Sequence, residues 1–174
     1  MSDPKVRIVH LSPDALAALA AGDIAAADAR SPVPLSQWLV SDEAIGTWKY
    51  RARQVVETPE DVEWVTGVIW SVPMRCVVGK AGFHAAPDDE GMVEVGYAVD
   101  PAYRRQGYAR ASLLAMLARA LADSDVRTFR ASVSPDNAAS LALIAQLPFV
   151  EVGEQWDDED GLETIFELDV STPA

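Results

Sequence analysis

One segment constrains the fold more than any other part of this 174-residue chain. Residues 92–99 place apolar side chains with a period of two, which is typical of a half-buried strand. A basic turn with one glycine follows at 104–110, and four leucines between 113 and 121 then form the apolar stripe of an amphipathic helix. Residues 128–133 predict another strand. A strand, a helix and a strand in this order form a right-handed parallel unit, so the segment predicts a mixed α/β sheet.

The remaining elements surround that unit. Residues 5–11 predict a strand that leads into Ser12-Pro13-Asp14, where a hydroxyl can cap a helix and proline suits its first position. Short polar breaks between β-rich runs predict an antiparallel meander. Those runs cover 64–70, 74–83 and 92–99. Further helices are predicted from Ser41 to Glu57 and over 135–146. Two terminal strands are predicted over 149–156 and 162–168, on either side of an acidic turn at 157–161. We expect a single domain over 1–174, with a mixed, mostly antiparallel sheet of about six or seven strands flanked by helices.

Charge and hydropathy exclude several kinds of partner. The chain has 14 Lys plus Arg against 27 Asp plus Glu, a net charge of −13, whereas a general nucleic-acid binder needs a cationic face. The longest apolar run, Ala15–Ala21, is far shorter than the roughly 20 residues that cross a bilayer. The single cysteine, Cys76, cannot form an intrachain disulfide. We expect a cytoplasmic protein without nucleic-acid or membrane partners.

The turn at 104–110 is the strongest candidate for a binding site. It contains 3 of the chain's 14 basic residues, although the chain as a whole is acidic. Gly107 allows backbone to approach a ligand closely, and the N–H groups of a first helical turn, at the positive end of the helix dipole, form an anion site. A diphosphate would suit this place. The alternative is a solvated helix start with a few arginines.

This turn resembles the signature of the GNAT superfamily of acetyl-CoA-dependent N-acetyltransferases. The family pattern Arg/Gln-x-x-Gly-x-Gly/Ala after the fourth strand is matched by residues 104–109. A second family element, an Asn followed by a helix and a Leu-Gly-Phe-like end, is matched by Asn137 and by Leu147-Pro148-Phe149. The acidic end, 153–163, is similar to the branch that contains ribosomal-protein N-terminal acetyltransferases. The resemblance covers residues 92–168 and is less specific in the N-terminal part.

The resemblance implies where acetyl-CoA binds. The loop would bind the coenzyme A diphosphate mainly through backbone N–H groups, and the pantetheine arm would lie along the fourth strand. In the family this strand splays from the fifth, so that its backbone pairs with the arm like an added strand. The implied cofactor-binding residues are Tyr97, Ala98, Val99, Arg104, Arg105, Gln106, Gly107, Tyr108, Ala109 and Asn137. The family often forms dimers through the C-terminal strands, so a homodimer is one expected assembly.

Two positions depart from the family's catalytic pattern. Ile144 stands where many relatives have a tyrosine that protonates the leaving thiolate, and Ser132 stands where the ribosomal enzymes have a glutamate base. Glu94 on the fourth strand is the best candidate base, with an ion pair or a solvated strand end as the alternative. Ser140 could donate to the thiolate or be a small packing residue. His84 could face the same cleft or be a hydrogen-bonded histidine at a strand end.

Other polar and aromatic residues receive structural interpretations. Trp48, Trp64 and Trp70 could line an acceptor pocket, but tryptophans at regular positions more often belong to the core. Arg51 and Arg53 are expected on a solvated helix face. No metal site is expected, because the two histidines and the single cysteine lack ligand spacing.

Two functional hypotheses follow. In the first, the protein transfers an acetyl group from acetyl-CoA directly to a primary amine of a small molecule or a protein N-terminus, through a ternary complex. An acidic surface would attract cationic amines. In the second, the protein is a catalytically degenerate acyl-CoA-binding sensor or scaffold, which the residues at 132 and 144 favour.

Overall fold

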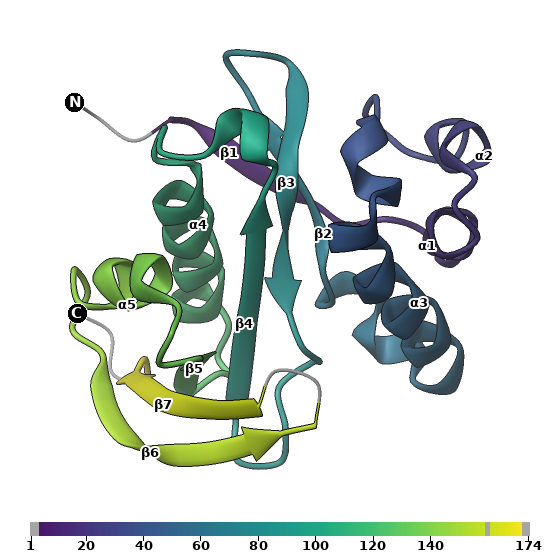
Figure 1. Ribbon diagram of the computed structural model, residues 1–174. Coiled ribbons are helices and arrows are strands. Elements are labelled where there is room, and N and C mark those ends of the chain that lie inside the picture. Colours follow the sequence, from purple (N-terminus) through teal and green to yellow (C-terminus); the bar gives the residue numbers. More distant parts are fainter. Residues whose placement is uncertain (1–3, 159–160, 172–174) are drawn as a thin grey trace. The chain divides into compact units, whose positions relative to one another are not determined.

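The computed structural model describes residues 4–158 and 161–171 of the chain. The strands are β1 Val6–Val9, β2 Gly67–Ser71, β3 Cys76–Phe83, β4 Met92–Val99, β5 Thr128–Val133, β6 Val150–Asp157 and β7 Gly161–Asp169 (Figure 1). The helices are α1 Pro13–Ala20, α2 Ile24–Asp28, α3 Asp42–Glu57, α4 Tyr108–Ala122 and α5 Ala138–Ile144, with short 3-10 helices η1 Gln37–Val40, η2 Pro59–Glu63 and η3 Pro101–Tyr103. Glu159 and Asp160 of the expected acidic turn lie outside the described residues.

The strands follow the order β1-β2-β3-β4-β5-β7-β6. The β4–β5 pair is parallel, whereas the β1–β2, β2–β3, β5–β7 and β6–β7 pairs are antiparallel. The predicted mixed, mostly antiparallel sheet with flanking helices is therefore confirmed. The register of β4 with β5 runs from Met92 opposite Thr128 to Glu94 opposite Arg130, which is the first part of β4. A splay of the remaining part of β4 from β5 stays a prediction.

The chain forms two compact units. The N-terminal unit contains residues 1–86 and 96–116, and the C-terminal unit contains residues 87–95 and 117–174. The chain passes from one unit to the other within β4 and within α4.

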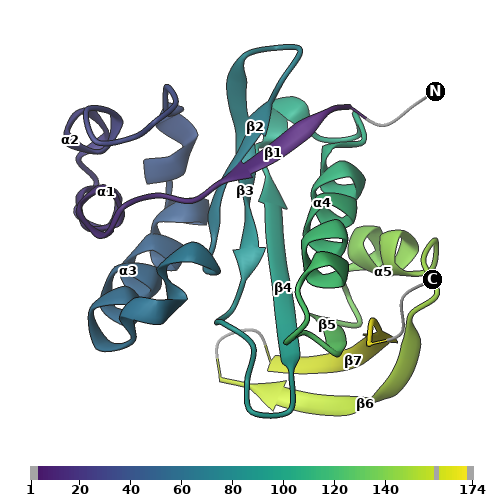
Figure 2. The ribbon, with the colours of Figure 1, turned by 180° about the vertical axis from the view of Figure 1, so that it is seen from behind.

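The core of the N-terminal unit is built by α1 and α3 together with β1–β3. Ser12 accepts a hydrogen bond from the N–H of Ala15 at 3.3 Å and so caps α1, as its sequence predicts. Leu16 and Leu19 of that helix are fully buried, and so is Trp48 of α3. The Trp48 indole donates to the carbonyl of Leu39 at 2.8 Å. Trp48 is therefore a core residue. Figures 1 and 2 show α1–α3 on one side of the strands and the start of α4 on the other.

The C-terminal unit has one packed sheet face and one polar sheet face. In β5 the residues Phe129, Ala131 and Val133 are buried, whereas Arg130 and Ser132 between them are only half-buried. The rings of Phe129 and Phe149 lie 5.8 Å apart, so the residue after the Leu-Pro pair keeps the expected apolar contact. The polar face therefore carries Ser132 of β5, where the ribosomal enzymes have a glutamate.

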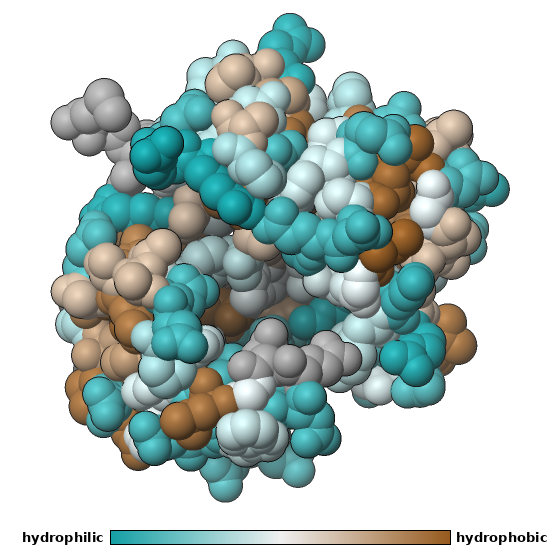
Figure 3. All heavy atoms as spheres, in the orientation of Figure 1, coloured by the Kyte–Doolittle hydropathy of each residue, from teal (hydrophilic) through white to brown (hydrophobic). Residues whose placement is uncertain are grey.

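The described surface is largely hydrophilic on the face seen in Figure 3, with hydrophobic side chains in separate patches. The β6–β7 pair contributes four exposed large hydrophobic residues, Val150, Val152, Trp156 and Leu162. Trp156 and Leu162 lie opposite one another in the register. Among residues 4–158 and 161–171, no helix is long and apolar enough to cross a membrane.

Candidate cofactor and active site

The turn between β4 and α4 contains two residues in the left-handed backbone region. Arg105 has φ 58° and Gly107 has φ 83°, and α4 begins directly afterwards at Tyr108. Left-handed residues within a turn direct successive backbone N–H groups into a concave anion-binding site. The first turn of α4 adds unpaired N–H groups and the positive end of its dipole. The backbone at this turn therefore fits a diphosphate.

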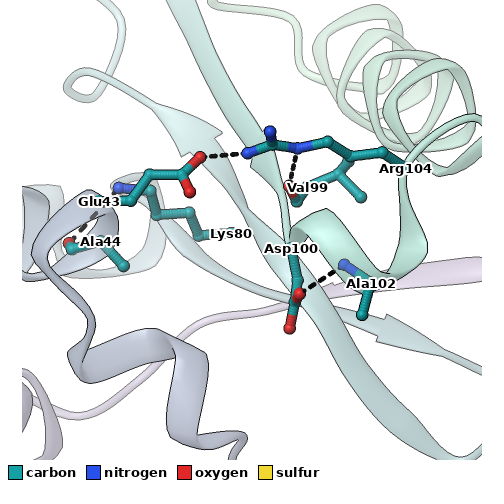
Figure 4. Close-up of polar contacts among 7 residues, drawn as sticks. All are labelled: Glu43, Ala44, Lys80, Val99, Asp100, Ala102 and Arg104. Carbon is teal, nitrogen blue, oxygen red and sulfur yellow. Dashed lines mark hydrogen bonds and ion pairs between the residues drawn. The ribbon is translucent and has the colours of Figure 1, made fainter.

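Arg104 extends its side chain away from the turn (Figure 4). Its Nε donates to the carbonyl oxygen of Val99 at 3.0 Å, and its Nη2 forms an ion pair with Glu43 at the start of α3. Both charged side chains are about half exposed. The guanidinium thus connects the end of β4 with α3.

The other residues of the turn have different surroundings. Arg105, Gln106 and Gly107 are exposed, and the Gln106 amide donates to the carbonyl of Ala102 at 3.3 Å. Tyr108 is buried, and its hydroxyl lies 3.1 Å from that of Ser71 on β2. Tyr108 therefore fixes the start of α4 with its side chain, so that only its backbone can serve a ligand at the turn.

Close contact with β3 fixes the second half of β4. The N–H of Asp100 donates to the carbonyl of Val78 at 3.0 Å. A Cβ atom at Gly79 would lie 2.3 Å from the carbonyl oxygen of Ala98, so only glycine allows this approach. The structure therefore places the predicted arm-binding residues, 97–99, in the same unit as the turn at 104–109 and directly before it.

A buried lysine lies close to the ion pair between Glu43 and Arg104. Lys80 of β3 donates to the hydroxyl of Thr47 and to the carbonyl of Ala44 at 3.4 Å (Figure 4 shows the second contact). Burial lowers the pKa of Lys80 to about 8, although the nearby Glu43 acts in the opposite direction. No sequence signal predicted this burial, because a lysine in a strand is ordinarily exposed.

We expect Lys80 to make stability depend on pH. Its folded-state pKa of about 8 is below the ordinary 10.5, so between these values the unfolded chain binds more protons and stability rises with pH. The wild type should gain up to about 3 kcal/mol relative to Lys80→Met as the pH rises across this window. Urea unfolding at several pH values measures the difference. Lys49→Met, at an exposed position of α3, is the control, and an unchanged difference between wild type and Lys80→Met would contradict the prediction.

A buried polar network fixes the segment that follows β3. Arg51 Nη1 donates to the carbonyl of His84 at 2.9 Å and to Gln54 Oε1 at 2.6 Å. Gln54 Nε2 donates to the same His84 carbonyl at 2.7 Å and to Asp61 Oδ2 at 2.5 Å, and Asp61 Oδ1 accepts from the N–H of Ala86 at 2.8 Å. Arg51 and Asp61 are both buried, and burial lowers the pKa of Arg51, while Tyr50 and Asp61 oppose that shift.

The expectation of a solvated helix face at Arg51 is therefore wrong, whereas Arg53 is exposed as expected. The physical reason is that α3 turns Arg51 to its packed side, where the His84 carbonyl and Thr66 supply acceptors. A signal was present in the sequence. The buried residues of α3 recur at helical spacing, and Arg51 occupies one of these positions; they are Ala44, Trp48, Arg51 and Val55.

The remaining predicted site residues belong to the C-terminal unit. Asn137 caps α5, with its Oδ1 accepting from the N–H of Ser140 at 3.1 Å. Glu94 lies opposite Arg130 in the register, and Arg130 donates to Glu167 at 2.9 Å. The structure therefore brings Asn137 and Ser140 together and aligns Glu94 with a charged pair. The turn at residues 104–109 lies in the N-terminal unit.

The two positions that depart from the family pattern are filled by structural contacts. Ile144 is buried, and the Ser132 hydroxyl accepts a hydrogen bond from Gln155 at 3.2 Å. The same Gln155 amide donates to Glu163 at 3.0 Å. In the part of the chain that the structure describes, no group of three or more His, Cys, Asp or Glu side chains could bind a metal ion.

Comparisons with known proteins show the family of this chain. A family model described as an acetyltransferase (GNAT) domain matches residues 5–150. The uncharacterized N-acetyltransferase YjdG of Bacillus subtilis (strain 168) is 32% identical over 74 residues, a match that covers 42% of this chain and 44% of that protein. The matched segment therefore spans less than half the length of that curated relative.

Two solved structures show the likeness of fold. RimL, a ribosomal alpha-N-protein acetyltransferase in complex with coenzyme A, is 17% identical with a TM-score of 0.63, covering 98% of this chain and 96% of that chain. A mutant form of the spermidine/spermine N-acetyltransferase SpeG from Vibrio cholerae is 12% identical with a TM-score of 0.65, covering 95% and 94%. Because the family model matches most of the sequence, including the turn at residues 104–109, the chain belongs to the GNAT family of acetyltransferases.

Proposed function

We propose that this protein transfers an acetyl group from acetyl-CoA directly to a primary amine, in a ternary complex of enzyme, acetyl-CoA and acceptor. The observation that carries the proposal is the left-handed turn at Arg105 and Gly107 immediately before α4, within the segment that matches the family. In this proposal residues 1–174 act as one domain. The diphosphate of coenzyme A binds the backbone of residues 104–109, and the pantetheine arm lies along residues 97–99. Asn137 contacts the cofactor from the start of α5.

The proposed chemistry requires removal of protons from the acceptor. An amine is mostly ammonium at neutral pH and must lose a proton before it attacks the thioester carbonyl. Glu94 is the proposed base, and the Ser140 hydroxyl is proposed to hydrogen-bond to the departing sulfur. The alignment of Glu94 with Arg130 supports an alternative in which Glu94 is part of an ionic row.

The acceptor is proposed to be cationic, either a small amine or a protein N-terminus. The net charge of −13 favours the approach of cations through long-range attraction. The names of RimL and SpeG include one acceptor of each kind, a ribosomal protein and a polyamine. Both classes therefore belong in the first acceptor screen.

The test measures binding and turnover separately. Calorimetry with acetyl-CoA measures cofactor binding, and release of thiol in the presence of polyamines, aminoglycosides and peptides with basic N-termini measures transfer. We expect binding of acetyl-CoA and thiol release that depends on an amine. A folded protein that does not bind acetyl-CoA would contradict the proposal.

A second candidate function is a sensor or scaffold that binds acyl-CoA without turnover. It is favoured by the buried Ile144 and by Ser132, whose hydroxyl is engaged by Gln155, because neither residue can exchange a proton as the family's tyrosine and glutamate do. The same assays distinguish the two functions. A sensor binds acetyl-CoA but releases no thiol with any amine.

We expect Arg104 and Arg105 to contribute less to cofactor binding than the backbone of the turn. Both side chains are exposed, and exposed charge pairs contribute only about 0 to 1 kcal/mol and weaken with salt. Arg104→Ala and Arg105→Ala should each weaken acetyl-CoA binding by at most about tenfold, since tenfold corresponds to about 1.4 kcal/mol. Calorimetry at two salt concentrations measures this. A loss of several orders of magnitude in either variant would show that a side-chain clamp dominates.

A further inference from the structure

The proposed acetyl transfer leaves one proton without an acceptor. The nitrogen of an ammonium acceptor loses two protons on its way to an amide: one before attack, which the proposal assigns to Glu94, and one as the amide forms. In many relatives the leaving sulfur is protonated by a tyrosine, and Ile144 stands at that position here. A group that carries this second proton from the nitrogen to the sulfur would complete the reaction beside the Ser140 hydrogen bond, and the inference rests on the proposed function.

His84 lies directly against β4. A Cβ atom at Gly96 would lie 3.1 Å from Nε2 of His84 and 3.6 Å from its Cδ2. This spacing means that the imidazole occupies the space a side chain at position 96 would need. Because residue 96 is glycine, Nε2 of His84 can lie next to the backbone of β4. Imidazole ordinarily titrates near pH 6.5, which suits proton exchange at neutral pH.

Hydrogen bonds from buried Arg51 and half-buried Gln54 fix the backbone at His84. Its carbonyl accepts hydrogen bonds from Arg51 at 2.9 Å and from Gln54 at 2.7 Å. Two residues later, the N–H of Ala86 donates to buried Asp61. Contacts from both α3 and η2 therefore hold the short segment 84–86, which limits the positions that the imidazole can reach.

The position of Gly96 relative to the cofactor turn places His84 near the reacting end. In the proposed function, a diphosphate at the turn after β4 directs the pantetheine arm back along Val99, Ala98 and Tyr97. The three steps of strand from Val99 to Gly96 span about 10 Å, so the arm's acyl end would approach Gly96. His84, Gly96, the arm-binding residues and the turn all belong to the N-terminal unit.

We propose that His84 is a catalytic residue that carries the second proton of the acceptor nitrogen to the sulfur. The nitrogen forms its bond to the thioester carbon, and the carbon–sulfur bond breaks with its electron pair going to sulfur. Neutral Nε2 accepts the N–H proton and then donates it to the thiolate. The products are the acetylated amine and free coenzyme A thiol, and His84 returns to its neutral form.

The first experiment compares His84→Ala with His10→Gln. His10 is the other histidine of the chain; its Nδ1 lies 2.9 Å from the carbonyl of Val65. We expect His84→Ala to lower kcat about 10² to 10⁴-fold, as loss of a general acid–base group does, with acetyl-CoA affinity retained. Added imidazole should restore part of the lost kcat in proportion to its concentration. His10→Gln should keep wild-type kcat and gain nothing from imidazole.

The second experiment tests the contact with β4. Gly96→Ala should force the imidazole to shift by a few tenths of an ångström and lower kcat several-fold, because small misplacements of a catalytic group are costly. In the His84→Ala background the same change should have little effect, since the imidazole is gone. Thermal unfolding of all variants identifies any loss of folded protein.

The outcomes separate this inference from the proposed function. Wild-type protein that binds acetyl-CoA but releases no thiol with any amine overturns the proposed function. Given an active wild type, a folded His84→Ala variant whose kcat stays within about threefold of wild type overturns the role of His84. A large loss of kcat in His84→Ala also overturns the role of His84 if imidazole restores no activity and if Gly96→Ala lowers kcat equally in the wild-type and His84→Ala backgrounds. That result indicates only a structural role.

Discussion

Gly107→Glu is expected to weaken acetyl-CoA binding at least 100-fold, a loss of about 2.7 kcal/mol. The backbone at this position has φ 83°, which costs roughly 1–2 kcal/mol for a residue with a side chain. The new carboxylate also lies at the turn where the diphosphate is proposed to bind, so it repels the ligand. Calorimetry on the folded variant measures the loss.

A matched control separates backbone strain from damage to the site. Gly22→Glu introduces the same charge at another left-handed glycine of the same unit, with φ 76° and only Ile45 near the new Cβ, at 3.7 Å. It should lower stability and keep wild-type affinity for acetyl-CoA. If folded Gly107→Glu binds acetyl-CoA as the wild type does, the diphosphate is bound elsewhere.

The strands and helices could be predicted because their signals are local. Ser12 and Pro13 mark the start of α1 by their chemistry, and the cap is formed as expected. All seven predicted strands are present, since period-two apolar runs and proline-bearing breaks need no knowledge of distant contacts. The turn at residues 104–109 also has a local signal, because glycine allows close approach of backbone to a ligand and readily adopts the left-handed conformation found at Gly107.

The side-chain partners around the site could not be predicted, because they come from distant parts of the chain. Arg104 forms its ion pair with Glu43, 61 residues earlier, and Arg51 donates to the carbonyl of His84, 33 residues later. Neither pairing leaves a local pattern. The contact of His84 with Gly96 likewise depends on how β3 returns beside β4, although glycine in a strand is itself a sign of close approach.

The surroundings of Glu94, the candidate base, also depend on a distant part of the chain. The sequence places Glu94 on β4 between two buried valines, which the structure confirms. Its register partner is known only once β4 and β5 are paired, and that partner is Arg130, whose guanidinium donates to Glu167. A carboxylate beside such a pair can serve either as a base or as a member of an ionic row. Only turnover distinguishes these two roles.

Glu94→Gln is expected to lower kcat about 10² to 10⁴-fold while acetyl-CoA affinity is retained, because glutamine keeps the shape of the side chain but cannot accept the ammonium proton. The low-pH side of the rate profile should become flatter. Raising the pH, which supplies neutral amine from solution, should partly restore the variant. Steady-state kinetics on an accepted amine, across a range of pH, measure all three effects.

Glu167→Gln is the matched control, since it removes the carboxylate that accepts from Arg130 on the neighbouring strand. If Glu94 acts only in an ionic row, both variants should change stability by similar amounts and leave kcat near the wild-type value. If Glu94 is the base, only its own variant loses turnover, and only that loss diminishes as the pH rises. Wild-type turnover by Glu94→Gln at neutral pH would therefore remove Glu94 from the reaction and leave water or His84 to take the ammonium proton.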